Sequence, residues 1–210
     1  MKKKELQHRS YLCEVRAEEN ENGIALITGR PIVYNSTTDL GWFSEEIEQG
    51  ALNGTDLTDV RFLVNHDTSK IPLARSRRNN GNSTMTLIPD EQGLIMHADI
   101  DIENNTEAKS LNSAIKRGDI SGMSFMFTIE DEEWQDLESD YPKRIIKKIG
   151  SIVEVSAVTF PAYQSTSIYS RNNKEALENA RKTLENVKQR SVDTDLILAK
   201  EKFIFFANKL

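Results

Sequence analysis

The run Ile152-Val-Glu-Val-Ser-Ala-Val-Thr-Phe-Pro-Ala-Tyr163 has the character of a β-strand with apolar residues on both of its faces. Glu154 interrupts this apolar pattern, and a carboxylate is costly to bury unless it is paired or hydrogen-bonded. An exposed edge position or a structural salt bridge would explain Glu154 without any function. The functional explanation is a carboxylate that is held against a histidine.

A histidine and a serine lie in two other strand-like runs. They are His66 in Val60-Arg-Phe-Leu-Val-Asn-His-Asp67 and Ser124 in Ile120-Ser-Gly-Met-Ser-Phe-Met-Phe127. Because side chains alternate between the faces of a strand, we expect His66 to end an apolar row with Val60, Phe62 and Val64. An imidazole at the end of such a row is half-buried and still reachable.

The other two histidines show less promising patterns. His97 alternates with Asp99 and Asp101, opposite an apolar face, which indicates a solvated surface residue. His8 lies in a charged N-terminal segment and carries no functional signal. A structural histidine is still the usual explanation for any single histidine, His66 included.

Together, a serine, a histidine and a carboxylate are the parts of an activated-serine hydrolase. Almost any chain of this length contains these residue types, and an ordinary strand serine is the default interpretation of Ser124. The chain has no Gly-x-Ser-x-Gly motif, which argues against an α/β-hydrolase. If Glu154 is not the acid, Asp67 is the neighbouring carboxylate, although it would point to the opposite face of its strand.

A specific succession of motifs runs from about Gly29 to Arg171. Its main pieces are Asn65-His-Asp67, Pro72-Leu-Ala-Arg75, Gly122-Met-Ser-Phe125 and Glu154-Val-Ser-Ala-Val-Thr-Phe-Pro-Ala-Tyr163. In this succession the chain resembles the prohead maturation proteases of tailed bacteriophages. It departs from the family pattern at Gln49, Ala74 and Met126, none of which is a proposed catalytic side chain.

This resemblance implies a fold, an activity and partners. The family looks distantly related to the herpesvirus assembly proteases, so we expect a mainly β protein with flanking helices, built on a β-barrel of that type. The implied activity is that of a serine endopeptidase, with His66 as general base, Ser124 as nucleophile and Glu154 as the third member. The implied substrates are the scaffold, or a scaffold-like extension of the major capsid protein, and the protease itself. The implied location is the assembling prohead in the host cytoplasm, and a homo-oligomer is compatible with it.

Composition limits the other classes of function. The formal net charge of −6 argues against a nucleic-acid binder. The single cysteine excludes an internal disulfide and a cysteine-based zinc cluster, and no motif has metal-ligand spacing. We therefore expect no metal and no organic cofactor. No apolar run has the length of a membrane span or a signal peptide, so no membrane partner is expected.

The chain divides into an expected protease domain, residues 1–171, and a helical C-terminal tail, residues 172–210. Within the domain, one helix is expected after Asn104, which together with Glu107 forms a capping box, and it ends at Gly118. The acidic residues of 130–140 and the basic residues that follow predict a solvated hairpin. The tail is expected to form a pair of helices that pack on the barrel, to serve as a docking or oligomerisation segment, or to be removed by self-cleavage, with a cut near 191–195.

Two other functions compete with the protease. One is a catalytically inactive, protease-like domain that serves as an internal scaffold or capsid-binding protein. The other is an esterase or amidase that uses the same trio on small substrates. The presence of His66, Ser124 and Glu154 in matching contexts argues against an inactive copy.

Overall fold

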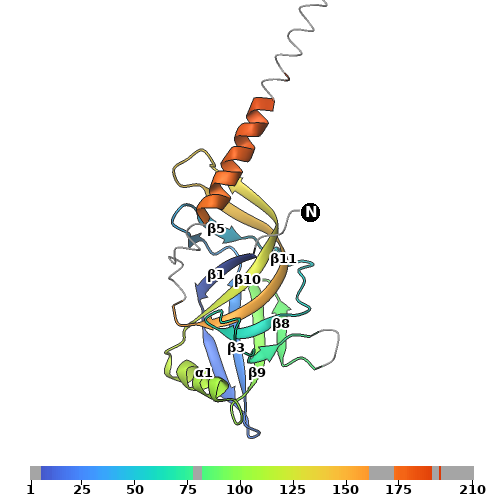
Figure 1. Cartoon of the computed structure of the whole chain (residues 1–210), viewed down its shortest axis with the longest axis vertical. Coiled ribbons are helices and arrows are strands. Elements are labelled where there is room, and N and C mark those ends of the chain that lie inside the picture. The colour runs from blue at the N-terminus through green and yellow to red at the C-terminus, as the bar shows by residue number, and fades with distance from the viewer. Residues whose placement is uncertain (1–5, 78–81, 161–172, 191–193, 195–210) are drawn as a thin grey trace, which may run out of the picture.

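The structure, a computed structural model, describes residues 6–77, 82–160, 173–190 and 194 (Figure 1). The described chain consists mostly of β-strands, with one helix inside the strand region and a second helix after it. None of the described helices is long and apolar enough to cross a membrane. The expectation of a mainly β protein with flanking helices is therefore confirmed.

The larger sheet has seven strands and carries all three residues of the expected site or the turns next to them. Its main path runs in the order β1 (Leu6–Leu12), β10 (Gly122–Gln135), β11 (Lys143–Val158), β5 (Ser44–Ile47) and β4 (Thr38–Asp39). Off this path, β6 (Arg61–Val64) pairs in parallel with the second half of β11, and β7 (Ala74–Arg75) pairs with β6. β11 is thus bordered by β10 along one edge and by β5 and β6 along the other.

The smaller sheet has four strands, in the order β2 (Val15–Glu19), β3 (Ile24–Val33), β9 (Gly93–Asp101) and β8 (Met85–Pro89). In β9 the residues at even positions from Leu94 to Ile100 are buried, as the alternation of the sequence predicts. These side chains join those of β10 and β11 in one hydrophobic core between the two sheets. The four-stranded sheet therefore acts as the apolar support of the seven-stranded one.

The hydrogen bonds of the described strands do not close the two sheets into a barrel. The sheets pack against each other through the shared core instead. The expected barrel of the herpesvirus assembly protease type is therefore not confirmed and stays a prediction.

β10 and β11 form the long hairpin that the charge pattern of the sequence predicts. Ion pairs connect its acidic and basic arms, Lys147 to Glu133 at 3.3 Å, Lys148 to Glu130 at 3.3 Å and Arg144 to Glu132 at 2.7 Å. β11 is a single strand of 16 residues, and β5 and β6 pair with successive parts of it. The pairing of β10 with β11 shifts register at several points, and most of the extra residues lie in β11.

Helix α1 (Thr106–Arg117) leads into β10, as expected, but its N-cap is one residue later than predicted. The side chain of Asn105, and not that of Asn104, accepts hydrogen bonds from the backbone N–H groups of Glu107 and Ala108. Asn104 is held by Asp101 at the end of β9, which leaves the cap to its neighbour. Gly118 ends the helix in the left-handed conformation, as predicted.

A helix at 173–190 packs on the β10–β11 hairpin at the end of the molecule opposite α1 (Figure 1). Leu177 is buried in a small cluster with Leu40 and Phe43, and Arg181 donates hydrogen bonds to the carbonyl oxygens of Leu137 and Ser139. Of the expected tail, this part packs on the body of the protein. The expected cut near 191–195 and the rest of the tail lie outside the described residues, except for Thr194.

Candidate active site

His66 lies in a tight turn directly after β6, and not in a strand row as the sequence analysis expects. Asn65 and His66 both have positive φ values, 51° and 59°, which swing the imidazole away from the direction of the strand. The side chain of Asn65 holds this turn against the end of β11 through hydrogen bonds with Thr159. Two consecutive positive φ values thus fall at the residue predicted as the base and at the residue before it.

The imidazole of His66 is bonded to Glu154, as the sequence predicts. His66 Nδ1 lies 2.5 Å from Glu154 Oε1, and the glutamate side chain is only 1% exposed. An ionised carboxylate only accepts hydrogen bonds, so Nδ1 carries the hydrogen and Nε2 is left as the basic nitrogen. A buried carboxylate that fixes the tautomer of a histidine is the arrangement found in activated-serine hydrolases.

Ser156 forms a second connection between His66 and Glu154. Its hydroxyl donates to Glu154 Oε2 at 2.5 Å and accepts from the backbone N–H of His66 at 3.2 Å. Both oxygens of Glu154 are therefore occupied, one by the imidazole and one by this serine. The network holds the carboxylate in place and ties the His66 turn to β11.

Ser124 lies on the same face of the sheet, one strand away. The register pairs Ser124 with Ser156 and Met126 with Glu154, and paired residues have Cβ atoms about 4.5–5.5 Å apart. Ser124 is fully buried, and its hydroxyl donates to the backbone carbonyl of Arg9 in β1 at 2.7 Å. Among the described residues it makes no hydrogen bond to His66. The structure thus brings His66 and Glu154 into contact and places Ser124 on the neighbouring strand, between them and β1.

A second histidine lies against the first. The rings of His8, on β1, and His66 meet edge to face with centroids 4.8 Å apart. Burial, followed by repulsion from a charged His66, lowers the pKa of His8 to about 4, so His8 is neutral at neutral pH. The sequence analysis assigns no role to His8, because only the pairing of β1 with β10 brings it to this face.

His8, His66 and Glu154 are also close enough to hold a metal ion, since their ligand atoms lie within 4.8 Å of one another. A metal would have to displace one of the two hydrogen bonds that Glu154 already accepts. The observed contacts are those of a carboxylate that orients an imidazole. Asp67, the alternative acid, accepts hydrogen bonds from Ser69 and takes no part in this network.

On the opposite face of β1, Arg9 forms a buried ion pair with Glu45, which connects this strand to β5. Arg9 Nη2 donates to Glu45 Oε2 at 2.7 Å, and Arg9 Nε contacts the other oxygen. Burial raises the pKa of Glu45, but the positive charges of Arg9 and Arg144 outweigh it and keep the pKa below its usual value. Glu45 is therefore a buried anion that depends on the arginines around it.

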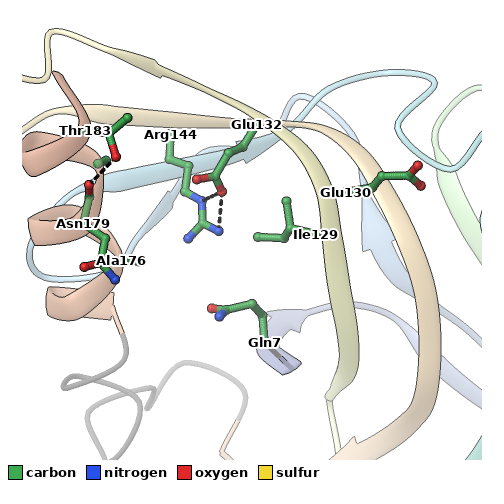
Figure 2. Close-up of a pocket in the computed structure, with 9 residues that line it drawn as sticks. Gln7, Ile129, Glu130, Glu132, Arg144, Ala176, Asn179 and Thr183 are labelled. Carbon is green, nitrogen blue, oxygen red and sulfur yellow. Dashed lines mark hydrogen bonds and ion pairs between the residues drawn. The ribbon is translucent and has the colours of Figure 1, made fainter. Parts of the chain in front are cut away.

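A pocket of about 560 Å³ adjoins this group of charged residues (Figure 2). It lies between the hairpin and the helix at 173–190, with Gln7 of β1, Arg144 and Glu132 among the residues that line it. Figure 2 shows the ion pair of Arg144 and Glu132 facing the pocket and Gln7 reaching toward it from β1. The pocket lies on the Arg9 side of β1, away from His66.

Comparison with known proteins identifies the family of the chain. A family model described as caudovirus prohead serine protease matches residues 12–183, most of the chain. The chain belongs to this family. The family resemblance stated from the motifs is thereby confirmed.

This chain is similar to the prohead protease of Enterobacteria phage HK97. The two are 25% identical over 159 residues, which cover 74% of this chain and 64% of the HK97 protein. The chain thus matches somewhat less than two thirds of the length of that relative. No solved structure matches this chain.

Sequence reasoning missed Ser156, His8 and the partnership of Arg9 with Glu45. Ser156 had a visible signal, because it lies two residues after Glu154 and shares its face in a strand. For His8 and Arg9 the sequence carries no such signal. Their positions depend on the pairing of β1 with β10, between segments more than a hundred residues apart.

Proposed function

We propose that this chain is a serine endopeptidase of phage head maturation. Its substrates are the scaffold, or the scaffold-like extension of the major capsid protein, and the protease itself. The observation that carries the proposal is the 2.5 Å contact of His66 with the buried Glu154, beside Ser124, in a member of the prohead protease family.

In the proposed mechanism Ser124 is the nucleophile. Its oxygen forms a bond to the carbonyl carbon of the scissile peptide while His66 Nε2 takes its proton. The C–N bond then breaks, and the same nitrogen returns the proton to the leaving amine. Water, activated by His66 in the same way, releases the acyl group from Ser124.

Glu154 and Ser156 act through His66. Glu154 stabilises the imidazolium that forms during the reaction, and a buried, preorganised carboxylate does so at little reorganisation cost. Ser156 keeps that carboxylate in position. Glu154 is thus the third member of the triad, and Ser156 is a positioning residue.

Confinement inside the prohead follows from the same function. A free protease would degrade scaffold and capsid protein before a shell existed, so activity belongs inside the assembling prohead in the host cytoplasm. We assign residues 1–171 to the protease domain and 172–210 to a tail that docks or is removed by self-cleavage. The domain needs no organic cofactor for this chemistry, and a homo-oligomer is compatible with it.

Co-expression with the capsid and scaffold proteins of the source virus tests the proposal. The parent chain is expected to shorten these proteins, and Ser124→Ala is expected to leave them intact. Ser151→Ala, a serine of β11 that hydrogen-bonds Thr128 away from His66, is the matched control and is expected to cleave normally. Intact substrates with the parent chain would favour the inactive scaffold protein instead.

A further inference from the structure

β1 covers the edge of β10 next to the proposed nucleophile. The hydroxyl of Ser124 lies 2.7 Å from the carbonyl oxygen of Arg9, and Ser10 is the residue paired with Ser124. The peptide group between Arg9 and Ser10 is therefore next to the proposed nucleophile. Because Ser124 is completely buried and Ser10 is its partner on β1, a substrate strand on this edge of β10 would have to replace β1.

The edge of β10 that β1 covers suits an extended peptide of any origin. β1 pairs antiparallel with β10 from Leu6, opposite Thr128, to Leu12, opposite Gly122. Such pairing uses main-chain hydrogen bonds, which any extended strand supplies. The region matched by the family model begins at residue 12, so it contains β10 and β11 but almost none of β1.

Beside this edge of β10, the buried carboxylate of Glu45 is placed to pair with a positively charged side chain. Arg9 and Glu45 are 2% and 1% exposed, and Arg144 lies 3.5 Å from the same carboxylate. Arg144 pairs more closely with Glu132, at 2.7 Å, so Arg9 is the cation that pairs most closely with Glu45. Removing one partner of a buried ion pair is costly, whereas exchanging one arginine for another keeps the pair intact.

A second recognition position lies two residues before the arginine. Gln7 shares the face of Arg9, and it lines the pocket of about 560 Å³ next to the helix at 173–190 (Figure 2). Glu130, Glu132 and Arg144 make part of that pocket polar. An extended peptide in the place of β1 would direct its corresponding side chain into this pocket.

We propose that substrates bind as extended strands on the edge of β10 in place of β1, with an arginine in the Glu45 site directly before the scissile bond. This inference rests on the proposed function. Glu45 is then the specificity-determining residue of the protease. β1 is the internal occupant that a substrate has to displace.

Two synthetic peptides with blocked ends test the arginine site. One has the sequence of residues 6–12, Leu-Gln-His-Arg-Ser-Tyr-Leu, and the other carries citrulline, which is uncharged and similar in shape, in place of arginine. The full chain is expected to cut the first peptide between arginine and serine, and to cut the citrulline peptide at least about tenfold more slowly, because a charge-assisted pair is lost. In Glu45→Gln this difference is expected to disappear.

A disulfide that fastens β1 tests the displacement, and it does not depend on the folding of Glu45→Gln. Leu6→Cys with Thr128→Cys joins paired positions of β1 and β10, in a chain whose natural cysteine is replaced by Cys13→Ala. The oxidised chain is expected to cut neither the peptide nor the capsid precursor, and reduction is expected to restore both. The two single-cysteine chains serve as controls.

The outcomes separate this inference from the proposed function. Equal cutting of both peptides, failure to cut the arginine peptide while the capsid precursor is cut, or full activity of the oxidised chain would overturn the inference and leave the protease intact. Failure of every chain to cut either the precursor or the peptides would overturn the proposed function, and this inference with it.

Discussion

The two sheets bury different kinds of side chain, although they share one core. Every buried polar or charged strand residue that the structure describes belongs to the seven-stranded sheet, on β1, β5, β10 or β11. The buried strand residues of the four-stranded sheet are apolar or glycine. Buried polar groups lower the stability of a protein unless they are hydrogen-bonded or paired. The polar network therefore makes demands on the seven-stranded sheet that the apolar interior of the four-stranded sheet does not make. We infer that one sheet supplies stability and the other supplies chemistry.

The largest loss of folding stability is expected from placing a charge in the interior of the four-stranded sheet. Ala98 on β9 is fully buried, and Ala98→Asp would leave an unpaired carboxylate there, which costs about 4 kcal/mol or more. We expect the variant to lose most of its folded population, as measured by thermal unfolding. Thr86→Asp, at an exposed position of the neighbouring β8, is the control and should melt within a few degrees of the parent. A folded Ala98→Asp would contradict the supporting role of this sheet.

The second prediction is a substitution in the seven-stranded sheet that lowers activity far more than stability. Glu154→Gln keeps the shape of the side chain but no longer stabilises a charged His66. We expect the rate of proteolysis to fall about a thousandfold or more, with a much smaller change in the melting temperature. Rates measured beside thermal unfolding check this. Normal cleavage by Glu154→Gln would remove Glu154 from the triad.

These two predictions also show what the sequence reveals and what it does not. Alternation identifies the buried face of β9, and the helix signals place α1 within one residue. The contact of His66 with Glu154 was predicted from the chemistry of the residues and from the family resemblance. The path of the chain at Asn65–His66 was not. Asn and His tolerate positive φ better than most residues, but their presence alone does not predict two consecutive positive values.

Long-range pairing was the other feature that the sequence did not predict. The chain forms β1 and β2 on either side of Cys13 and Glu14, and these two strands belong to different sheets. The unbroken course of β11 through Gly150 was missed for the same reason. Both depend on which strands become neighbours, and local periodicity does not encode that choice.

The third prediction compares an arginine ion pair from each sheet. Arg9→Ala leaves the buried Glu45 with Arg144 alone, and we expect it to lower the free energy of unfolding by about 2–3 kcal/mol. Arg30→Ala breaks a partly exposed pair with Asp90 in the other half of the molecule, and we expect a loss of about 1 kcal/mol or less. Urea unfolding of both variants measures the difference. Equal losses would contradict the distinction between the sheets.

The smallest effect concerns His8 and pH. The pKa of His8 is about 4 in the folded chain and 6.5 as its ordinary value, so the unfolded chain binds more protons between these values. Its contribution to stability is therefore complete above pH 6.5 and declines as the pH falls toward 4. We expect the parent to lose about 1 kcal/mol more than His8→Gln between pH 7 and 4.5 in urea unfolding, after allowance for the solvent exposure of the ring. Identical losses in the two proteins would rule out this role of His8.

The central claim is that His66 and Glu154 activate Ser124, and a serine-reactive fluorophosphonate probe tests it most directly. After incubation, the intact mass and the labelled peptide of the parent are compared with those of Ser124→Ala, Glu154→Gln and Ser156→Ala. We expect one adduct, located on Ser124, which is absent from Ser124→Ala and forms much more slowly in Glu154→Gln. An adduct on Ser156, or equal labelling of the parent and Glu154→Gln, would contradict the account.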